Sequence, residues 1–221
     1  MEKADSPLRN VLHTVEDACK RARRDPGDVT LIAVSKTRPA SSIEPLLLEG
    51  HRHFGENRVQ EAADKWPALR EAHPATQLHL IGQLQSNKAL DAVQLFDCIH
   101  SLDRPSLVKA LAKAFDKSGR QVPCFIQVDV GDEPQKGGCL PGDLPALIKQ
   151  ARDADIPLAG LMCLPPADIE PAPFFAFLDK LARDHGLDGR SMGMSGDYET
   201  AVMLGATHIR VGTALFGERG S

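Results

Sequence analysis

A lysine at the end of a predicted strand is the first residue whose type and place could do chemistry. Lys36 closes an apolar run, and the alternation of a strand places its side chain on the same face as Ile32 and Val34. Desolvation lowers the pKa of a lysine, and a neutral amine can form a Schiff base with an aldehyde or ketone. Lysines at strand ends also extend into solvent, so Lys36 alone does not establish this chemistry.

Arg210 supplies a second signal, because it lies between apolar residues in the last predicted strand. In a closed barrel this strand pairs with the first one, so Arg210 and Lys36 would approach each other near the same end. Two like charges are unfavourable there unless a ligand lies between them. A guanidinium facing the pyridine nitrogen of pyridoxal 5'-phosphate (PLP) is one reason for such an arrangement.

Two glycine-containing turns could hold a phosphate group. Residues 193–196 read Gly-Met-Ser-Gly between a strand and a helix, and Gly212-Thr213 follow the last strand. Loops after strands seven and eight of a barrel, close to helix N-termini, often bind phosphate, and the hydroxyls of Ser195 and Thr213 add donors. Either turn alone is more typical of an ordinary connection between strand and helix. Asp197 and Glu199 would repel a dianion unless they turn outward.

The elements that must position these residues alternate strictly between strand and helix. This alternation predicts parallel strands with crossover helices. A doubly wound open sheet usually carries G-x-G-x-x-G at its first turn, and that motif is missing, so we predict an α/β fold with a single (β/α)₈ barrel of the TIM type. Residues 1–221 form one domain, in which residues 1–27 are an extra N-terminal helix and linker. The predicted strands are 29–36, 51–56, 77–83, 98–102, 123–130, 158–164, 190–194 and 208–212, and the predicted helices between them are 42–48, 59–69, 87–95, 106–117, 144–152, 174–183 and 197–204.

Composition and motifs exclude several classes of function. The formal net charge of −4 and the pI near 6.1 argue against nucleic-acid binding. The sequence has neither an apolar leader nor a span of about 20 apolar residues, so we expect a cytoplasmic protein with no membrane contact. Five scattered cysteines predict reduced thiols. His51 and His53 share a predicted strand face, but no third ligand is evident, so we predict no metal. The turn at 193–197 misses the G-x-S-x-G motif of serine hydrolases, and no G-x-x-x-x-G-K-[ST] loop occurs.

Several longer motifs carry a family resemblance over nearly the whole chain. They are Val34-Ser35-Lys36-Thr37, His53-Phe54-Gly55-Glu56-Asn57, residues 81–88 (IGQLQSNK), Gly160-Leu161-Met162, Ser191-Met192-Gly193-Met194-Ser195 and residues 210–217 (RVGTALFG). In this order they resemble the PLP homeostasis proteins, also described as YggS-like or proline synthase co-transcribed proteins. Arg190, where an apolar residue is usual, and a short proline-rich segment after Met162 depart from the common pattern.

The resemblance implies a fold, a cofactor and a function. The fold would be that of the N-terminal barrel of alanine racemase (PLP fold type III), with PLP held as an internal aldimine on Lys36 and Arg210 facing its ring nitrogen. Phosphate contacts would fall to Ser195, Gly212 and Thr213, with Asn57 and Met194 as pocket neighbours. Members of the family carry PLP or regulate its supply, with apo PLP-dependent enzymes as possible recipients, and no robust catalytic activity is attributed to them. We therefore expect a non-enzymatic monomer, and a solvated side chain for Lys136 in a family loop.

Three other functions stay open at this point. A PLP-dependent racemase or decarboxylase would need a second acid or base, which related racemases take from a tyrosine in a further β-domain; the single tyrosine here is Tyr198. An arginine at the ring nitrogen would also weaken the electron sink that such reactions need. A cofactor-free aldolase would use Lys36 for a Schiff base with a sugar phosphate. A regulatory protein would act through a protein partner.

Overall fold

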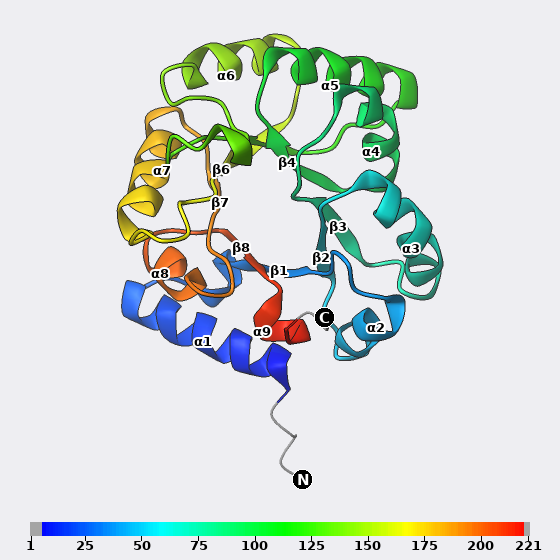
Figure 1. Cartoon of the computed structure of the whole chain (residues 1–221), viewed down its shortest axis with the longest axis vertical. Coiled ribbons are helices and arrows are strands. Elements are labelled where there is room, and N and C mark those ends of the chain that lie inside the picture. Colours follow the sequence, from blue (N-terminus) through cyan, green and yellow to red (C-terminus); the bar gives the residue numbers. More distant parts are fainter. Residues whose placement is uncertain (1–5, 219–221) are drawn as a thin grey trace.

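The eight strands close into a parallel barrel in which each strand pairs with the next and β8 pairs with β1 (Figure 1). The computed structural model describes residues 6–218. Ile32 in β1 lies opposite Arg210 in β8, which is the pairing of first and last strand that the sequence predicts. The strands are β1 Thr30–Val34, β2 His53–Glu56, β3 Gln77–Leu80, β4 Cys98–Leu102, β5 Cys124–Gln127, β6 Leu158–Met162, β7 Gly189–Ser191 and β8 His208–Val211. The predicted fold class is therefore confirmed.

Helices surround this barrel on the outside (Figure 1). They are α1 Pro7–Ala22, α2 Ala40–Leu48, α3 Val59–Ala72, α4 Ala89–Leu95, α5 Pro105–Ser118, α6 Leu144–Asp153, α7 Ala172–Asp184, α8 Tyr198–Met203 and α9 Thr213–Phe216, with short 3-10 turns at Pro26–Asp28, Ser86–Lys88 and Pro134–Lys136. Within the described part of the chain, no helix is both long enough and apolar enough to cross a membrane.

Helix α1 shows how sequence signals become packing. The Ser6 side chain accepts a hydrogen bond from the Arg9 N–H, and a proline at the first position suits a helix start. Leu8, Val11 and Val15 recur at helical spacing and are buried. The last turn carries Lys20 and Arg21, which belong to the basic run of residues 20–24 (KRARR), and cations there favour the negative end of the helix dipole.

That basic run also makes contacts that the sequence does not indicate. The Arg24 guanidinium donates to the carbonyls of Val202 and Ala206, at 2.7 and 2.8 Å, and thereby ties the segment after α1 to the end of α8. Arg21 forms an ion pair with Glu199 of α8. These interactions hold the N-terminal helix against the part of the barrel that leads into β8.

Boundaries differ from the prediction where polar residues follow a strand. Strand β1 ends at Val34, so Lys36 lies in the turn after it and not in the strand, and β2 begins at His53 and not at residue 51. Helix α9 at 213–216 was not expected, because four residues give no periodic pattern to recognise.

Candidate functional site

A cavity of about 320 Å³ lies at the C-terminal ends of the strands, the end of such barrels where sites are found. Every residue predicted for the cofactor site contributes to its wall, which is lined by Val34, Lys36, Arg38, Asn57, Ile81, Leu164, Met194, Ser195, Gly196, Arg210, Gly212 and Thr213. Arg38, Ile81 and Leu164 were not predicted. The structure thus brings together residues that lie up to 179 positions apart in the sequence, as do Val34 and Thr213.

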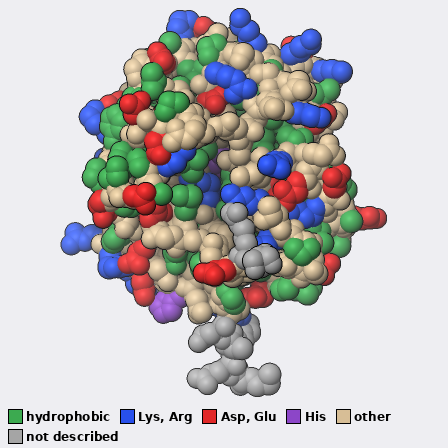
Figure 2. All heavy atoms as spheres, viewed as in Figure 1, with side chains coloured by type: hydrophobic (Ala, Val, Ile, Leu, Met, Phe, Trp, Pro, Cys, Tyr) green, Lys and Arg blue, Asp and Glu red, His purple; other side chains and the backbone are tan. Residues whose placement is uncertain are grey.

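The cavity wall is positively charged. Lys36, Arg38 and Arg210 line it, and the lining residues include no Asp or Glu. On the face drawn in Figure 2, Lys and Arg side chains gather around the middle of the molecule. Such a wall attracts an anion of small size.

The two acidic residues that could repel an anion are engaged elsewhere. Glu199 forms its ion pair with Arg21 on α1, and a carboxylate oxygen of Asp197 accepts a hydrogen bond from the Met194 N–H at 2.5 Å. Glu199 thus pairs with a residue outside the cavity, whereas the partner of Asp197 is the backbone N–H of Met194, which lines it. Neither carboxylate lines the cavity in which a dianionic ligand would lie.

A buried carboxylate holds the turn that carries Lys36. Glu56, fully buried at the end of β2, accepts hydrogen bonds from the Ser35 hydroxyl at 2.7 Å and from the Trp66 indole N–H at 3.0 Å. Its oxygen also lies 2.7 Å from the Lys65 ammonium group. Because Ser35 directly precedes Lys36, this cluster fixes the backbone from which the Lys36 side chain extends.

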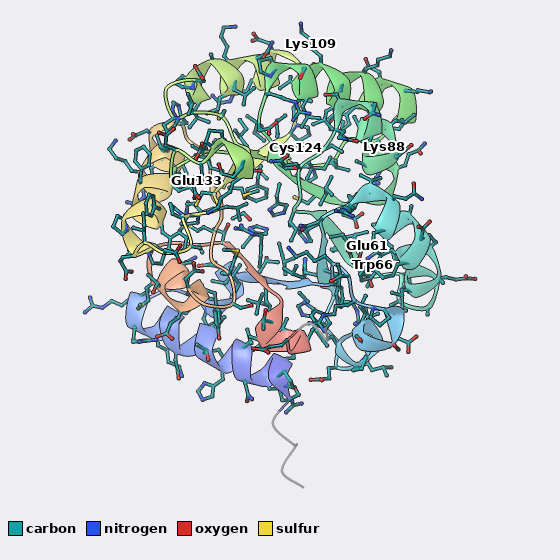
Figure 3. All side chains as sticks on the ribbon, viewed as in Figure 1. Glu61, Trp66, Lys88, Lys109, Cys124 and Glu133 are labelled. Atoms are coloured by element: carbon teal, nitrogen blue, oxygen red, sulfur yellow. The ribbon has the colours of Figure 1, made fainter. Side chains whose placement is uncertain are left out.

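Lys65 extends the same cluster over the turn. Its ammonium group donates to the carbonyls of Ser35 and Arg38, at 2.9 and 3.1 Å, and lies 3.2 Å from Glu61. Trp66 and Glu61 both come from α3 (Figure 3). This cluster was not predicted from the sequence, although Glu56 stands in one of the family motifs and is a charged residue at the end of a predicted strand.

Arg210 is held below the cavity by neutral acceptors. Its side chain is only 4% exposed, and its guanidinium donates to the Ser191 hydroxyl at 2.7 Å and to the Cys163 carbonyl at 2.8 Å. Burial lowers the pKa of Arg210 from its ordinary value, although a guanidinium keeps its proton in proteins. Ser191 and Cys163 had no assigned role in the sequence analysis.

The two predicted phosphate turns meet at one side of the cavity. The Gly212 N–H donates to the Ser195 hydroxyl at 3.1 Å, so the turns after β7 and β8 are directly connected. Gly193 has a φ of +94°, and a Cβ there would lie 2.6 Å from the Cβ of Ala201. Helices α8 and α9 have only six and four residues, so the donors here are single N–H and O–H groups rather than the dipole of a long helix.

Two other expectations need correction. His51 precedes β2 and its ring nitrogen lies 2.7 Å from the His53 carbonyl, so the two imidazoles do not share a strand face as ligands. Lys136 is not simply solvated, because its ammonium group donates to Glu133 and to the Pro165 carbonyl, at 2.6 and 2.9 Å. It therefore ties together the loops after β5 and β6.

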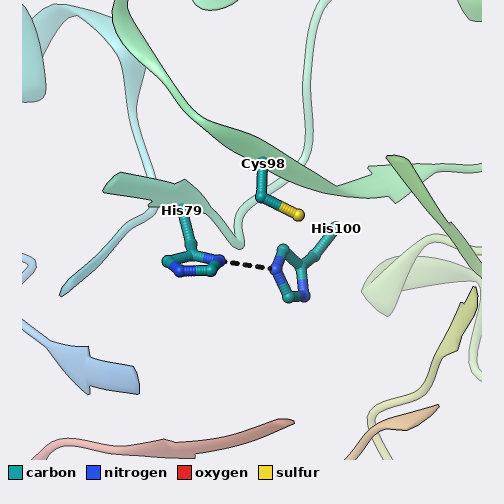
Figure 4. A group of neighbouring side chains, drawn as sticks. All are labelled: His79, Cys98 and His100. Carbon is teal, nitrogen blue, oxygen red and sulfur yellow. Dashed lines mark hydrogen bonds between the residues drawn. The ribbon is translucent and has the colours of Figure 1, made fainter. Parts of the chain in front are cut away.

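A buried group of possible metal ligands was not expected from the sequence. Donor atoms of His79, Cys98 and His100, on β3 and β4, lie within 4.8 Å of one another inside the barrel (Figure 4). Burial lowers the pKa of both imidazoles and raises the pKa of the Cys98 thiol. The histidines are therefore neutral, and the thiol keeps its proton.

Known proteins resemble this chain over most of its length. The family described as alanine racemase, N-terminal domain, matches residues 8–220. The pyridoxal phosphate homeostasis protein of Pseudomonas aeruginosa is 39% identical over 218 residues, which cover 96% of this chain and 94% of that protein. The protein of the same name from Escherichia coli K12 is 36% identical over 227 residues, covering 96% and 95%.

Solved structures give the same result for the fold. PipY of Synechococcus elongatus PCC7942, in its structure with PLP bound, is 40% identical and has a TM-score of 0.81, covering 92% of this chain and all of that one. Alanine racemase of Clostridium difficile 630 is 15% identical and has a TM-score of 0.70. The match covers 97% of this chain but only 57% of the racemase chain, and it supports the barrel fold alone. The chain belongs to the pyridoxal phosphate homeostasis protein family.

Proposed function

We propose that this chain binds PLP in the cavity, as a Schiff base on Lys36, and supplies or buffers the cofactor. The observation that carries the proposal is the placement of Lys36 and Arg210 on the wall of one cavity, with the Ser195 and Gly212-Thr213 turns beside them. An amine, a ring-nitrogen partner and a set of hydroxyl and N–H donors match the three polar parts of PLP. PLP bound to a relative that is 40% identical supports the same assignment.

The residues present fit such a cofactor. The cavity lies at the lower end of the range of about 300 to 1,000 Å³ that small-molecule sites occupy. Three cations on its wall suit a phosphate dianion, and Asn57 adds an amide. When bound, PLP supplies an aldehyde for amines; the protein supplies the amine of Lys36, the donors and the enclosure.

We propose that the protein carries PLP and does not catalyse a reaction with it. Proton transfer on both faces of a substrate needs two acid or base groups, and the lining residues include no Asp, Glu, His, Tyr or Cys beside Lys36. Tyr198 begins α8 and packs against the hydrophobic core. Apo PLP-dependent enzymes in the cytoplasm are the proposed recipients, and a monomer suffices because the described cavity needs no second subunit.

Absorbance of the purified protein tests this function. Added PLP is expected to give a visible-range Schiff-base band, and borohydride reduction followed by peptide mapping should place the adduct on Lys36. Lys36→Ala should lose the band and the adduct. Lys88→Ala, at a partly exposed lysine that pairs with Asp91, is the control and should keep both.

Two outcomes would contradict the proposal. A colourless wild-type protein that stays unlabelled after added PLP would remove the cofactor assignment. Exchange of the α-hydrogen of an amino acid by the purified protein, lost in Lys36→Ala, would instead identify a racemase or decarboxylase.

A further inference from the structure

A continuous chain of side-chain hydrogen bonds runs through the barrel interior to Arg210. Arg210 contacts the Ser191 hydroxyl at 2.7 Å, and that hydroxyl lies 2.9 Å from Nδ1 of His100. Nε2 of His100 lies 3.0 Å from Nδ1 of His79, a contact drawn in Figure 4, and Nε2 of His79 lies 3.1 Å from Nδ1 of His53. The chain thus connects the first residue of β2 with the arginine that lines the cavity.

The chemistry of its Arg210 end sets the direction of the bonds in this series. A guanidinium can only donate, so the Ser191 oxygen accepts from Arg210. The Ser191 hydroxyl is fully buried, and its own proton reaches a described acceptor at Nδ1 of His100. A reversed bond from His100 would leave that proton without a partner in a buried place, which is unfavourable.

The same argument assigns the proton positions of the three histidines. If Nδ1 of His100 accepts, its proton is on Nε2 and is donated to Nδ1 of His79. His79 then carries its proton on Nε2 and donates to Nδ1 of His53. All three imidazoles are therefore assigned to the neutral form with a proton on Nε2.

The surroundings keep these imidazoles neutral. Burial is the main cause that lowers the pKa of His53, His79 and His100. The His208 ring acts in the same sense on His79 and His100, and the Arg210 charge does so on His100. The Asp97 carboxylate opposes this effect at His53. The Phe125 ring stacks on the His100 ring, with 4.4 Å between their centroids, and covers one face of that imidazole.

We propose that His53, His79, His100 and Ser191 are positioning residues for Arg210. The chain directs a lone pair of the Ser191 oxygen at the guanidinium, and with the Cys163 carbonyl it fixes the plane that Arg210 presents to the cavity. This role toward PLP rests on the proposed function, whereas the order of donors and acceptors in the chain does not.

A metal ion at His79, Cys98 and His100 is the competing interpretation. Both ring nitrogens of His79 and of His100 already have hydrogen-bond partners, so an ion would have to break the chain. The raised pKa of the buried Cys98 thiol also opposes the thiolate that such an ion would need. The hydrogen bonds therefore satisfy all four ring nitrogens of His79 and His100 without a metal ion.

Two measurements test the proposal. Long-range ¹H–¹⁵N spectra of the labelled apoprotein near neutral pH should show the Nε2–H form for all three histidines. Ser191→Ala should then shift the signals of His100 and weaken PLP binding by about fivefold to tenfold, the factor for one hydrogen bond of ordinary net strength. Ser101→Ala is the matched control, because Ser101 is also fully buried but its hydroxyl has no described partner.

The results separate the possible failures. An Nδ1–H form of His79 or His100 in the apoprotein, or equal effects of the two serine variants on PLP affinity, would overturn the proposal. So would a stoichiometric metal in the purified protein that Cys98→Ser removes. Failure of the wild-type protein to bind PLP would count against the proposed function, while the spectra of the apoprotein would still decide the order of the hydrogen bonds.

Discussion

Replacing Glu56 by glutamine probes the cluster that holds the Lys36 turn. One oxygen of Glu56 accepts from Ser35 and Trp66 and faces Lys65, while the other oxygen is buried without a described partner. A glutamine of the same shape can keep its carbonyl toward the three donors. Its amide N–H groups would then occupy the place where no acceptor is described, and the negative charge beside the Lys65 ammonium group would be lost.

The size of the effect follows from these contacts. Removing one partner of a buried ion pair costs about 3 to 5 kcal/mol, and a buried unsatisfied amide costs about 1 to 3 kcal/mol. Lys65 is 10% exposed and keeps Glu61 and two carbonyl acceptors, so the lower end applies. We expect the free energy of unfolding to fall by about 3 kcal/mol, which for a chain of this length lowers Tm by about 6 to 12 °C.

Thermal and urea unfolding followed by circular dichroism measure this loss. Glu61→Gln is the matched control, because Glu61 faces the same lysine at 3.2 Å but its side chain is 28% exposed, and glutamine keeps the oxygen that accepts from the Thr37 N–H. A pair of that kind contributes at most about 1 kcal/mol. If Glu56→Gln lowers stability no more than Glu61→Gln does, the buried carboxylate is not what holds the turn, and the reasoning fails.

Three further predictions concern pH, backbone and thiols. Burial lowers the pKa of His51 and of His208 to about 4 from 6.5, so the unfolded chain binds more protons than the folded one between these values. Stability should therefore decrease as the pH is lowered from 6.5 to about 4, by up to about 1.4 kcal/mol per pH unit for each histidine. Tm measured at several pH values checks this, and a flat profile would contradict it. Gly193→Ala should cost about 2 kcal/mol because of its positive φ and close neighbours, whereas Gly196→Ala, which meets open space, should leave Tm nearly unchanged. All five cysteines are buried, and burial raises the pKa of Cys124 to about 12, so a thiol reagent should label the native protein slowly and the unfolded protein fully; fast labelling of the native state would argue against the burial.

The parts of the fold that the sequence predicts are those with local signals. Strands such as β1 and β6 are short apolar runs, and long helices such as α1 and α5 have a periodic apolar face. The period of two also places Lys36 and Val34 on the same wall, although β1 ends before the lysine. Arg210 was identified because a charged residue inside an apolar strand is unusual. Such patterns need no knowledge of what lies across the barrel.

The parts that the sequence does not predict depend on distant partners. Glu56 is satisfied by Ser35 from the turn after β1 and by two residues of α3, so its role appears only when these elements are packed together. The histidine chain depends on the register of β2, β3 and β4, which brings His53, His79 and His100 to neighbouring places inside the barrel. The spacing of residues within one segment of the sequence cannot reveal the register between separate strands.

The uncharged hydrogen-bonded side chains behind Arg210 also give a reason why this barrel would bind PLP without catalysing a reaction with it. The described hydrogen-bond acceptors of the guanidinium are a hydroxyl and a carbonyl, with neutral imidazoles behind them. These acceptors are uncharged, and a cavity wall lined by Lys36, Arg38 and Arg210 favours an anionic ligand. A permanent donor facing the pyridine nitrogen would keep that nitrogen unprotonated and weaken the electron sink of PLP. On the proposed function, strong binding of PLP and weak activation of bound amines would both follow from the same arginine.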